Sequence, residues 1–154
     1  MYLYLVRHGD ALSKNEDPQR HLSPQGQQAS ERIGNFLAAS GAVRPARIIH
    51  SGKPRAKQTA EIIAGCLQLG NVEAADDLDP NDHPELWAEQ LDETSDDLML
   101  VGHLPYLSRM VALLLLGDAD GELVVFPKAA VCCLSRDEEG MWLLEWHVAP
   151  ELLG

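Results

Sequence analysis

Short apolar runs that fit β-strands alternate along this chain with segments whose apolar residues recur at helical spacing. The three strongest predicted strands are 2–6, 46–50 and 98–101. The helical segments open at Pro24, Pro54 and Pro105, and proline is favoured at the first position of a helix. This alternation predicts an α/β fold, a three-layer sandwich with a mostly parallel central sheet and helices on both faces.

The last third of the chain follows a different pattern, typical of antiparallel strands. We predict strands at 123–126, 130–135 and 142–147, the last two joined by a turn at 138–140. Trp142 and Trp146 stand at even spacing in one of these strands and are expected to share a face. Between the second and third strong strands, 72–75 is a predicted edge strand, 76–84 a loop and 85–91 a short helix.

The 154 residues are enough for one domain with a core, and the net charge of −12 limits its partners. Such an acidic chain repels nucleic acid and anionic membranes at long range. No apolar run approaches the roughly 18 residues of a membrane span, and Arg7-His8 interrupts the apolar start, which therefore does not resemble a signal peptide. We expect a cytoplasmic protein, and the sequence indicates no particular oligomeric state.

Three cysteines form neither a disulfide framework nor a CxxC metal motif. Cys132 and Cys133 are adjacent in a predicted strand and should point to opposite faces of the sheet. Cys66 lies on the apolar face of a predicted helix. All three are expected to be reduced residues of the core.

Each strong strand runs into residues that bind anions or carry out chemistry. Arg7-His8-Gly9 follows the first strand, Ser51-Gly52-Lys53-Pro54-Arg55 follows the second, and Gly102-His103 follows the third. Parallel strands bring their carboxyl ends to one edge of the sheet, where α/β folds bind ligands. We therefore expect two guanidinium groups, two imidazoles and two helix N-termini to converge on a site for a tetrahedral dianion.

These residue types suit phosphoryl transfer. Arginine holds two phosphate oxygens in a planar fork, and an unprotonated imidazole is a nucleophile at neutral pH. Two nearby arginines should lower the pKa of His8 and keep its ring neutral. Gly9 would let the backbone approach a ligand closely.

Four motifs resemble those of the histidine phosphatase superfamily, which is also called the phosphoglycerate mutase-like family. They are Leu5-Val6-Arg7-His8-Gly9, the segment 51–60 (which is similar to S-P-x-x-R-A-x-Q-T-A), Val101-Gly102-His103-Leu104-Pro105, and the segment 20–26. The last resembles R-P-L-T-x-x-G of the small phosphohistidine phosphatases of the SixA type. Two positions depart from these patterns, because Gly52 and His21 replace prolines. The resemblance spans the chain and implies a single histidine phosphatase domain over residues 1–154.

The resemblance implies a role for each matching residue. His8 would attack phosphorus and carry a transient phosphohistidine, while Arg7, Arg55 and His103 would hold the phosphoryl oxygens. Arg20, with Gly9 and Ser51, would contact the substrate. The family requires no metal ion and no cofactor.

An alcohol leaving group needs a proton donor, and here the candidates are Asp79 and Asp82, with Asp10 a weaker third. The acidic run 76–82 is equally well explained as a solvated loop. A phosphohistidine leaves as an imidazole that solvent can protonate, so a weak acid would suit it. The predicted substrate is therefore phosphohistidine on a signalling or phosphotransfer protein.

Three alternatives remain at the level of sequence. The chain could be a phosphomonoesterase for a small sugar or nucleotide phosphate ester, with the proton donor as the distinguishing residue. It could be a non-catalytic module that binds phosphorylated partners. A metal hydrolase is disfavoured, because the six histidines show no HExxH or comparable ligand spacing.

Overall fold

A computed structural model describes residues 1–154 and contains one six-stranded sheet in the order β3-β2-β4-β1-β5-β6. The strands are β1 (Tyr2–Arg7), β2 (Arg47–His50), β3 (Val72–Ala74), β4 (Leu98–Gly102), β5 (Val131–Arg136) and β6 (Trp142–Val148). The helices are α1 (Pro24–Ser40), α2 (Pro54–Leu67), α3 (Pro84–Asp92), α4 (Tyr106–Leu116) and the short 3₁₀ helix η1 (Pro150–Leu153). β1 to β4 pair in parallel, and β5 and β6 are antiparallel additions, as the sequence pattern predicts.

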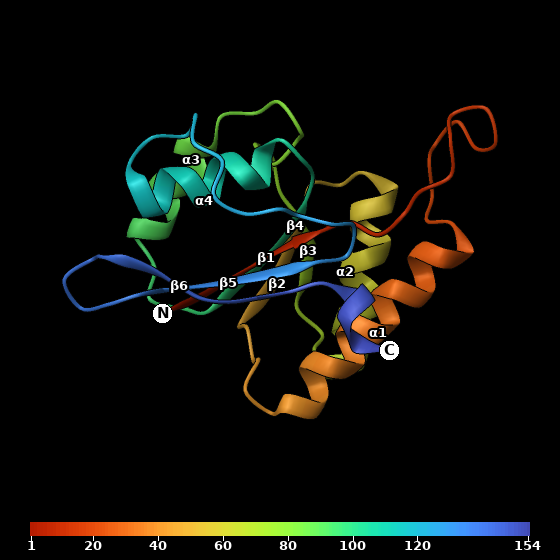
Figure 1. The fold of residues 1–154 in the computed structure, drawn as a ribbon, viewed down its shortest axis with the longest axis horizontal. Coiled ribbons are helices and arrows are strands. Elements are labelled where there is room, and N and C mark those ends of the chain that lie inside the picture. Colours follow the sequence, from red (N-terminus) through yellow and green to blue (C-terminus); the bar gives the residue numbers. More distant parts are fainter.

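Apolar residues on the two faces of the sheet form two separate cores. Leu3 and Leu5 point to one face and pack with α3 and α4, whereas Tyr4 and Val6 point to the other and pack with α1 and α2. The alternation follows from the two-residue period of a strand. Figure 1 shows α3 and α4 on one side of the sheet and α1, α2 and η1 on the other. The predicted three-layer sandwich is therefore confirmed.

Local sequence accounts for the ends of these helices. Proline opens α1, α2 and α3, and the Ser23 hydroxyl caps α1 by accepting a hydrogen bond from the Gly26 amide. α1 ends at Gly41, whose φ of 68° is a left-handed conformation that glycine adopts without a steric penalty. None of the helices has the length and apolar character needed to cross a membrane.

The prediction of a strand at 123–126 is wrong. Residues 121–126 have no regular secondary structure and pair with no strand of the sheet. Two side chains take the carbonyl groups that a strand would offer to a neighbour. His147 binds the carbonyl of Val125, and Arg7 binds that of Phe126.

The prediction that Trp142 and Trp146 share a face is also wrong. Cys133 pairs with Trp146 and Leu134 pairs with Leu144, which leaves one residue of β6 without a partner. Such a bulge shifts the side-chain alternation by one position. Trp142 consequently packs on the core beneath α3 and α4, whereas Trp146 packs on the core beneath α1 and α2.

Two of the three cysteines lie in the core as predicted, whereas the prediction is wrong for Cys66, which belongs to neither core. Cys132 and Cys133 are buried in opposite cores, and burial raises the pKa of each thiol to about 12. Cys66 is half-buried on α2 beside Gly34 of α1. All three are free thiols.

Candidate functional site

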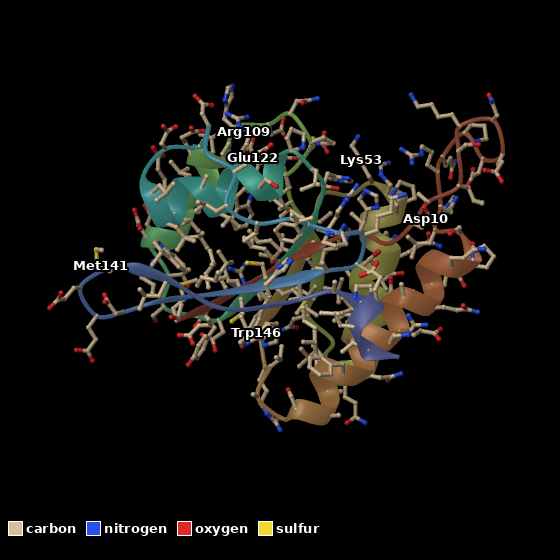
Figure 2. All side chains as sticks on the ribbon, in the orientation of Figure 1. Asp10, Lys53, Arg109, Glu122, Met141 and Trp146 are labelled. Carbon is tan, nitrogen blue, oxygen red and sulfur yellow. The ribbon has the colours of Figure 1, made fainter.

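Sheet order brings the three reactive segments to one edge, because β4 lies between β2 and β1. The imidazole centroids of His8 and His103 lie 5.1 Å apart, and Ser51 Oγ lies 2.6 Å from Nε2 of His103. Arg55 is close enough that its charge lowers the pKa of both histidines. Figure 2 shows this end of the molecule near Asp10 and Lys53, with the β5–β6 hairpin and Met141 at the opposite end.

His8 is held in the tautomer that a nucleophile requires. Its Nδ1 lies 2.7 Å from the carbonyl oxygen of Gly9, and a carbonyl can only accept, so Nδ1 carries the proton. Nε2 then keeps its lone pair and makes no hydrogen bond within the chain. The ring is 8% exposed. Burial, and after it the charges of Arg55 and Arg7, lowers the pKa of His8 to about 4, so the ring is neutral at pH 7. The direction agrees with the sequence prediction, but burial is a larger cause than the arginines.

His103 is the second neutral imidazole of the site. It is 1% exposed, and burial followed by the neighbouring His8 and Arg55 lowers its pKa to about 3. Its Nε2 meets the Ser51 hydroxyl, while Nδ1 is buried without a partner. The geometry thus gives Ser51 a role in orienting His103, and its predicted contact with substrate stays a prediction.

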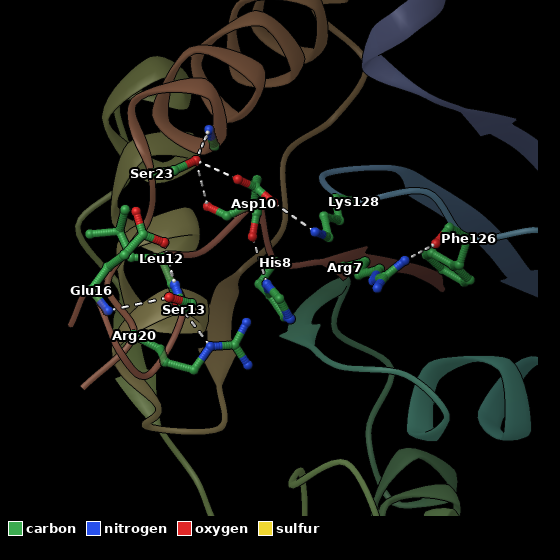
Figure 3. A network of polar contacts seen from close by, with 12 residues as sticks. Arg7, His8, Asp10, Leu12, Ser13, Glu16, Arg20, Ser23, Phe126 and Lys128 are labelled. Atoms are coloured by element: carbon green, nitrogen blue, oxygen red, sulfur yellow. Dashed lines mark hydrogen bonds and ion pairs between the residues drawn. The ribbon is translucent and has the colours of Figure 1, made fainter. Parts of the chain in front are cut away.

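Two half-buried guanidinium groups lie beside the histidines, and each has an N–H donor without a hydrogen-bond partner. Nε of Arg7 and Nε of Arg55 are both buried without a partner, and burial lowers the pKa of each group. Arg7 is oriented by a 2.8 Å bond from Nη1 to the carbonyl of Phe126, as Figure 3 shows. Buried polar groups are normally paired, so unsatisfied cationic donors beside a neutral imidazole form an environment suited to an oxyanion.

Arg20 reaches the same group from the loop before α1. Its Nε donates to the carbonyl of Leu12 over 3.0 Å, and its charge lowers the pKa of His8, Arg55 and His103. The backbone of Arg20 is left-handed, with φ of 54°. A non-glycine residue adopts this conformation only when its surroundings hold it there. The predicted set of Arg7, His8, Arg55, His103 and Arg20 therefore comes together in space.

The second motif contributes more than Arg55, which the sequence analysis did not anticipate. One turn further along α2, Thr59 Oγ1 accepts a hydrogen bond from the Gly9 amide at 3.0 Å, and Gln58 Oε1 accepts from the Leu22 amide at 2.7 Å. Both residues belong to the motif at 51–60, so the pattern contained the signal. Gln58 and Thr59 fix the loops that carry the site.

A side chain at Gly9 would collide with helix α1. A Cβ on Gly9 would lie 2.7 Å from the carbonyl oxygen of Gly26, and a Cβ on Gly26 would lie 2.0 Å from that of Asp10. These separations are far below van der Waals contact, so both glycines allow α1 to approach the loop after His8. The predicted contact of Gly9 with a ligand is a separate matter and stays a prediction.

The three candidate proton donors differ in their surroundings. Asp10 binds Lys128 Nζ at 2.6 Å and the Ser23 hydroxyl at 2.7 Å, which lowers its pKa and argues against proton donation. The half-exposed Asp79 lies 3.8 Å from Lys53 Nζ, on the side where its charge acts on Arg55. Asp82 Oδ2 accepts a hydrogen bond from the Asp79 amide at 2.8 Å. Of the three, Asp79 is the carboxylate whose charge acts on Arg55 and which has no short ion pair.

No group of three histidine, cysteine, aspartate or glutamate side chains comes together as a set of metal ligands. His21, one of the departures from the family pattern, lies 2.7 Å from Asp17 within the loop that carries Arg20.

Comparison with known proteins supports the same family. The model of the histidine phosphatase superfamily (branch 1) matches residues 3–83. A solved structure of the protein histidine phosphatase SixA complexed with tungstate is similar over all of both chains, with 29% identity and a TM-score of 0.88. A phosphohistidine phosphatase SixA structure from Agrobacterium tumefaciens covers 97% of each chain, with 23% identity and a TM-score of 0.77.

The fold also extends to relatives with other activities. A mycobacterial glucosyl-3-phosphoglycerate phosphatase is 18% identical, with a TM-score of 0.70 over 94% of this chain and 97% of that one. No curated protein matches the sequence significantly. The matched motifs, the sheet order and the cluster around His8 lead to one assignment: this chain belongs to branch 1 of the histidine phosphatase superfamily.

Proposed function

We propose that the protein is a phosphatase that removes the phosphoryl group from phosphohistidine on a signalling or phosphotransfer protein, with His8 as nucleophile. In this proposal residues 1–154 act as one histidine phosphatase domain. The observation that carries it is the hydrogen bond from His8 Nδ1 to the Gly9 carbonyl, which leaves the lone pair of Nε2 available beside two arginines. An imidazole in this state at neutral pH attacks phosphorus without a separate base.

In the first step, Nε2 of His8 forms a bond to phosphorus as the bond from phosphorus to the substrate imidazole breaks. The departing nitrogen takes the electron pair and a proton from solvent. Arg7, Arg55 and His103 bind the equatorial oxygens, and their preorganised charges and dipoles stabilise the transition state. Arg20 makes a further contact with the phosphoryl group or with the partner protein.

In the second step, water attacks the phosphoryl group on His8, and the proton that the water loses passes to the departing phosphate or to solvent. The P–N bond breaks, inorganic phosphate leaves, and the electron pair returns to Nε2. The Gly9 carbonyl accepts from Nδ1 throughout and favours the positive charge that the ring carries in the intermediate. Positive charge on the leaving imidazole makes this second displacement easier.

Two observations support phosphohistidine as the substrate. The proton donors are weakly organised, since Asp10 is paired with Lys128 and Asp79 is half-exposed. A nitrogen leaving group needs such help less than an alcohol does. In addition, the SixA structure that is 29% identical to this chain is described as a protein histidine phosphatase.

The second candidate is a phosphomonoesterase for a small sugar or nucleotide phosphate. Asp79 favours it, because this carboxylate lies 3.8 Å from Lys53 Nζ and its charge acts on Arg55, so a carboxyl group is available beside the cationic cluster. The glucosyl-3-phosphoglycerate phosphatase with the same fold acts on a substrate of this class.

A substrate panel tests the proposal. We would measure kcat/KM of the purified protein with a phosphohistidine-bearing phosphotransfer protein, with a phosphoserine protein and with 3-phosphoglycerate. The proposal predicts that phosphohistidine is preferred by about a hundredfold or more. A phosphate ester that is turned over about a thousandfold faster than phosphohistidine would overturn it in favour of the second candidate.

A further inference from the structure

The segment 121–126, which joins α4 to β5, is held by very few polar contacts. None of its residues takes part in a backbone–backbone hydrogen bond. Two side chains donate to its carbonyls instead. His147 Nε2 lies 2.7 Å from the oxygen of Val125, and Arg7 Nη1 lies 2.8 Å from that of Phe126.

The second of these bonds orients a residue of the site. It is the one hydrogen bond that the Arg7 side chain makes within the chain, since its buried Nε has no partner. Phe126 itself is 3% exposed and belongs to the core under α3 and α4. Packing fixes the position of the Phe126 ring, but the direction of its carbonyl depends on the backbone around it. On the C-terminal side of Phe126 that backbone is held by the hydrogen bond from the Ala130 amide to the Pro127 carbonyl, and on the N-terminal side it is held at Val125.

His147 controls this stretch of backbone from β6. A carbonyl only accepts, so Nε2 of His147 is the donor to Val125. The ring also meets Phe126 edge-on, with centroids 5.3 Å apart and planes at 81°. One side chain therefore contacts both the carbonyl of residue 125 and the ring of residue 126.

We propose that His147 is a positioning residue for Arg7, acting through the carbonyl of Phe126 to aim the guanidinium at the phosphoryl group. The inference rests on the proposed role of Arg7 in holding that group. His147 does not touch the substrate in this proposal. The acceptor of Arg7 is a backbone carbonyl, so no side-chain substitution at Phe126 removes it. A substitution at His147 is therefore the way to test whether the position of this carbonyl matters.

The test compares His147→Leu with His147→Gln. Leucine loses the donor, whereas the glutamine amide places a donor near the position of Nε2. Tungstate, a tetrahedral oxyanion, serves as the probe, and its Kd is measured by calorimetry alongside kcat/KM for the phosphohistidine protein. A hydrogen bond at the surface contributes modestly, so leucine should weaken tungstate binding and lower kcat/KM by about fivefold, and glutamine should restore both to within about twofold.

A double-mutant cycle separates positioning from general damage. If His147 acts through Arg7, His147→Leu should change tungstate affinity by less than about 1.5-fold when Arg7 is already alanine. An effect of full size in the Arg7→Ala protein would overturn the inference. Trp142→Leu, at the opposite end of β6, is the control for lost stability and should leave tungstate affinity unchanged while lowering the melting temperature.

The two proposals fail in different ways. A wild-type protein that binds tungstate but hydrolyses no phosphohistidine contradicts the proposed function, and the effect of His147→Leu on tungstate affinity then still decides the role of His147. Equal tungstate affinities for His147→Leu and the wild type would overturn the positioning role whatever the turnover.

Discussion

The backbone after β1 and the acidic loop before α3 approach the same site but are held very differently. The amides of His8 and Gly9 donate to Gly102 and Thr59, and the Ala129 amide meets the carbonyls of Arg7 and His8. The acidic loop, in contrast, holds Asp79 and Asp82 mainly through bonds between these two residues. His8 is thus preorganised from several elements, whereas Asp79 and Asp82 are half-exposed on a single loop.

This difference indicates which step of the proposed reaction the preorganised groups assist. Groups that are aimed before the substrate arrives do not have to reorganise during the reaction, and this is how enzymes stabilise a transition state effectively. In the proposed mechanism that preorganisation serves attack and charge stabilisation, and little of it serves protonation of the leaving group. The predictions that follow test this asymmetry, beginning with its preorganised side.

Replacing the nucleophile should have the largest effect. His8→Ala is expected to lower kcat for phosphohistidine hydrolysis by about 10⁴-fold or more, because it removes the proposed nucleophile. Incubation with a ³²P-labelled phosphohistidine protein should label the wild type with an acid-labile phosphate and leave the variant unlabelled. A folded His8→Ala protein with robust activity would refute the mechanism.

Loss of an arginine should be the next largest effect. Arg55→Ala is expected to lower kcat by about 10²- to 10³-fold, since it removes a preorganised donor to the phosphoryl oxygens. Arg55→Lys keeps the charge but loses the planar fork, and its activity should fall between the two. A rate for Arg55→Ala within a factor of about three of the wild type would show that the residue does not face the phosphoryl group.

The pKa of His8, which can be measured directly, should show an effect of intermediate size. Proton titration followed by NMR should find a pKa near the value of about 4 that burial and the arginines produce. Arg55→Ala should raise this pKa yet leave it below the ordinary value of 6.5, because burial is the larger cause. Activity should fall as the pH drops through this pKa, since protonation removes the lone pair on Nε2. A His8 pKa at or above 6.5 would contradict this assignment of causes.

The same histidines link stability to pH. His8 and His103 have folded-state pKa values of about 4 and about 3, both lower than the 6.5 of the unfolded chain. The unfolded state therefore binds more protons below pH 6.5, and the free energy of unfolding should fall as the pH decreases from there towards 4. Denaturant titrations of the wild type and of His103→Asn should show a shallower decline in the variant.

The smallest effect on phosphohistidine hydrolysis is expected from substitutions in the acidic loop. Asp79→Asn should change kcat for phosphohistidine by less than about twofold, because the leaving imidazole takes its proton from solvent. If the protein also hydrolyses esters, the same variant should slow that reaction by at least about tenfold. Asp77→Asn, which changes an exposed carboxylate of the same loop, serves as the matched control. A large loss of phosphohistidine activity in Asp79→Asn would show that the acidic loop is part of the catalytic apparatus.

Local patterns predicted much of this molecule. Apolar periodicity and the prolines at helix starts gave the order of strands and helices, and the resemblance of four motifs identified the residues that gather around His8. The errors arose where one segment meets another. Nothing within residues 123–126 reveals that two of their carbonyls accept from the side chains of His147 and Arg7, and nothing in residues 142–147 reveals the bulge that separates Trp142 from Trp146.

The amino-acid sequence by itself determined which residues stand at the ends of the parallel strands, because strand periodicity and turn residues act over short stretches of chain. Only the tertiary structure decided the state of those residues. The tautomer of His8, its lowered pKa, and the aim of Arg7 depend on burial and on carbonyl groups at Gly9 and Phe126. Solvent exclusion and hydrogen-bond direction are properties of the assembled chain, since they exist only after distant segments have packed together.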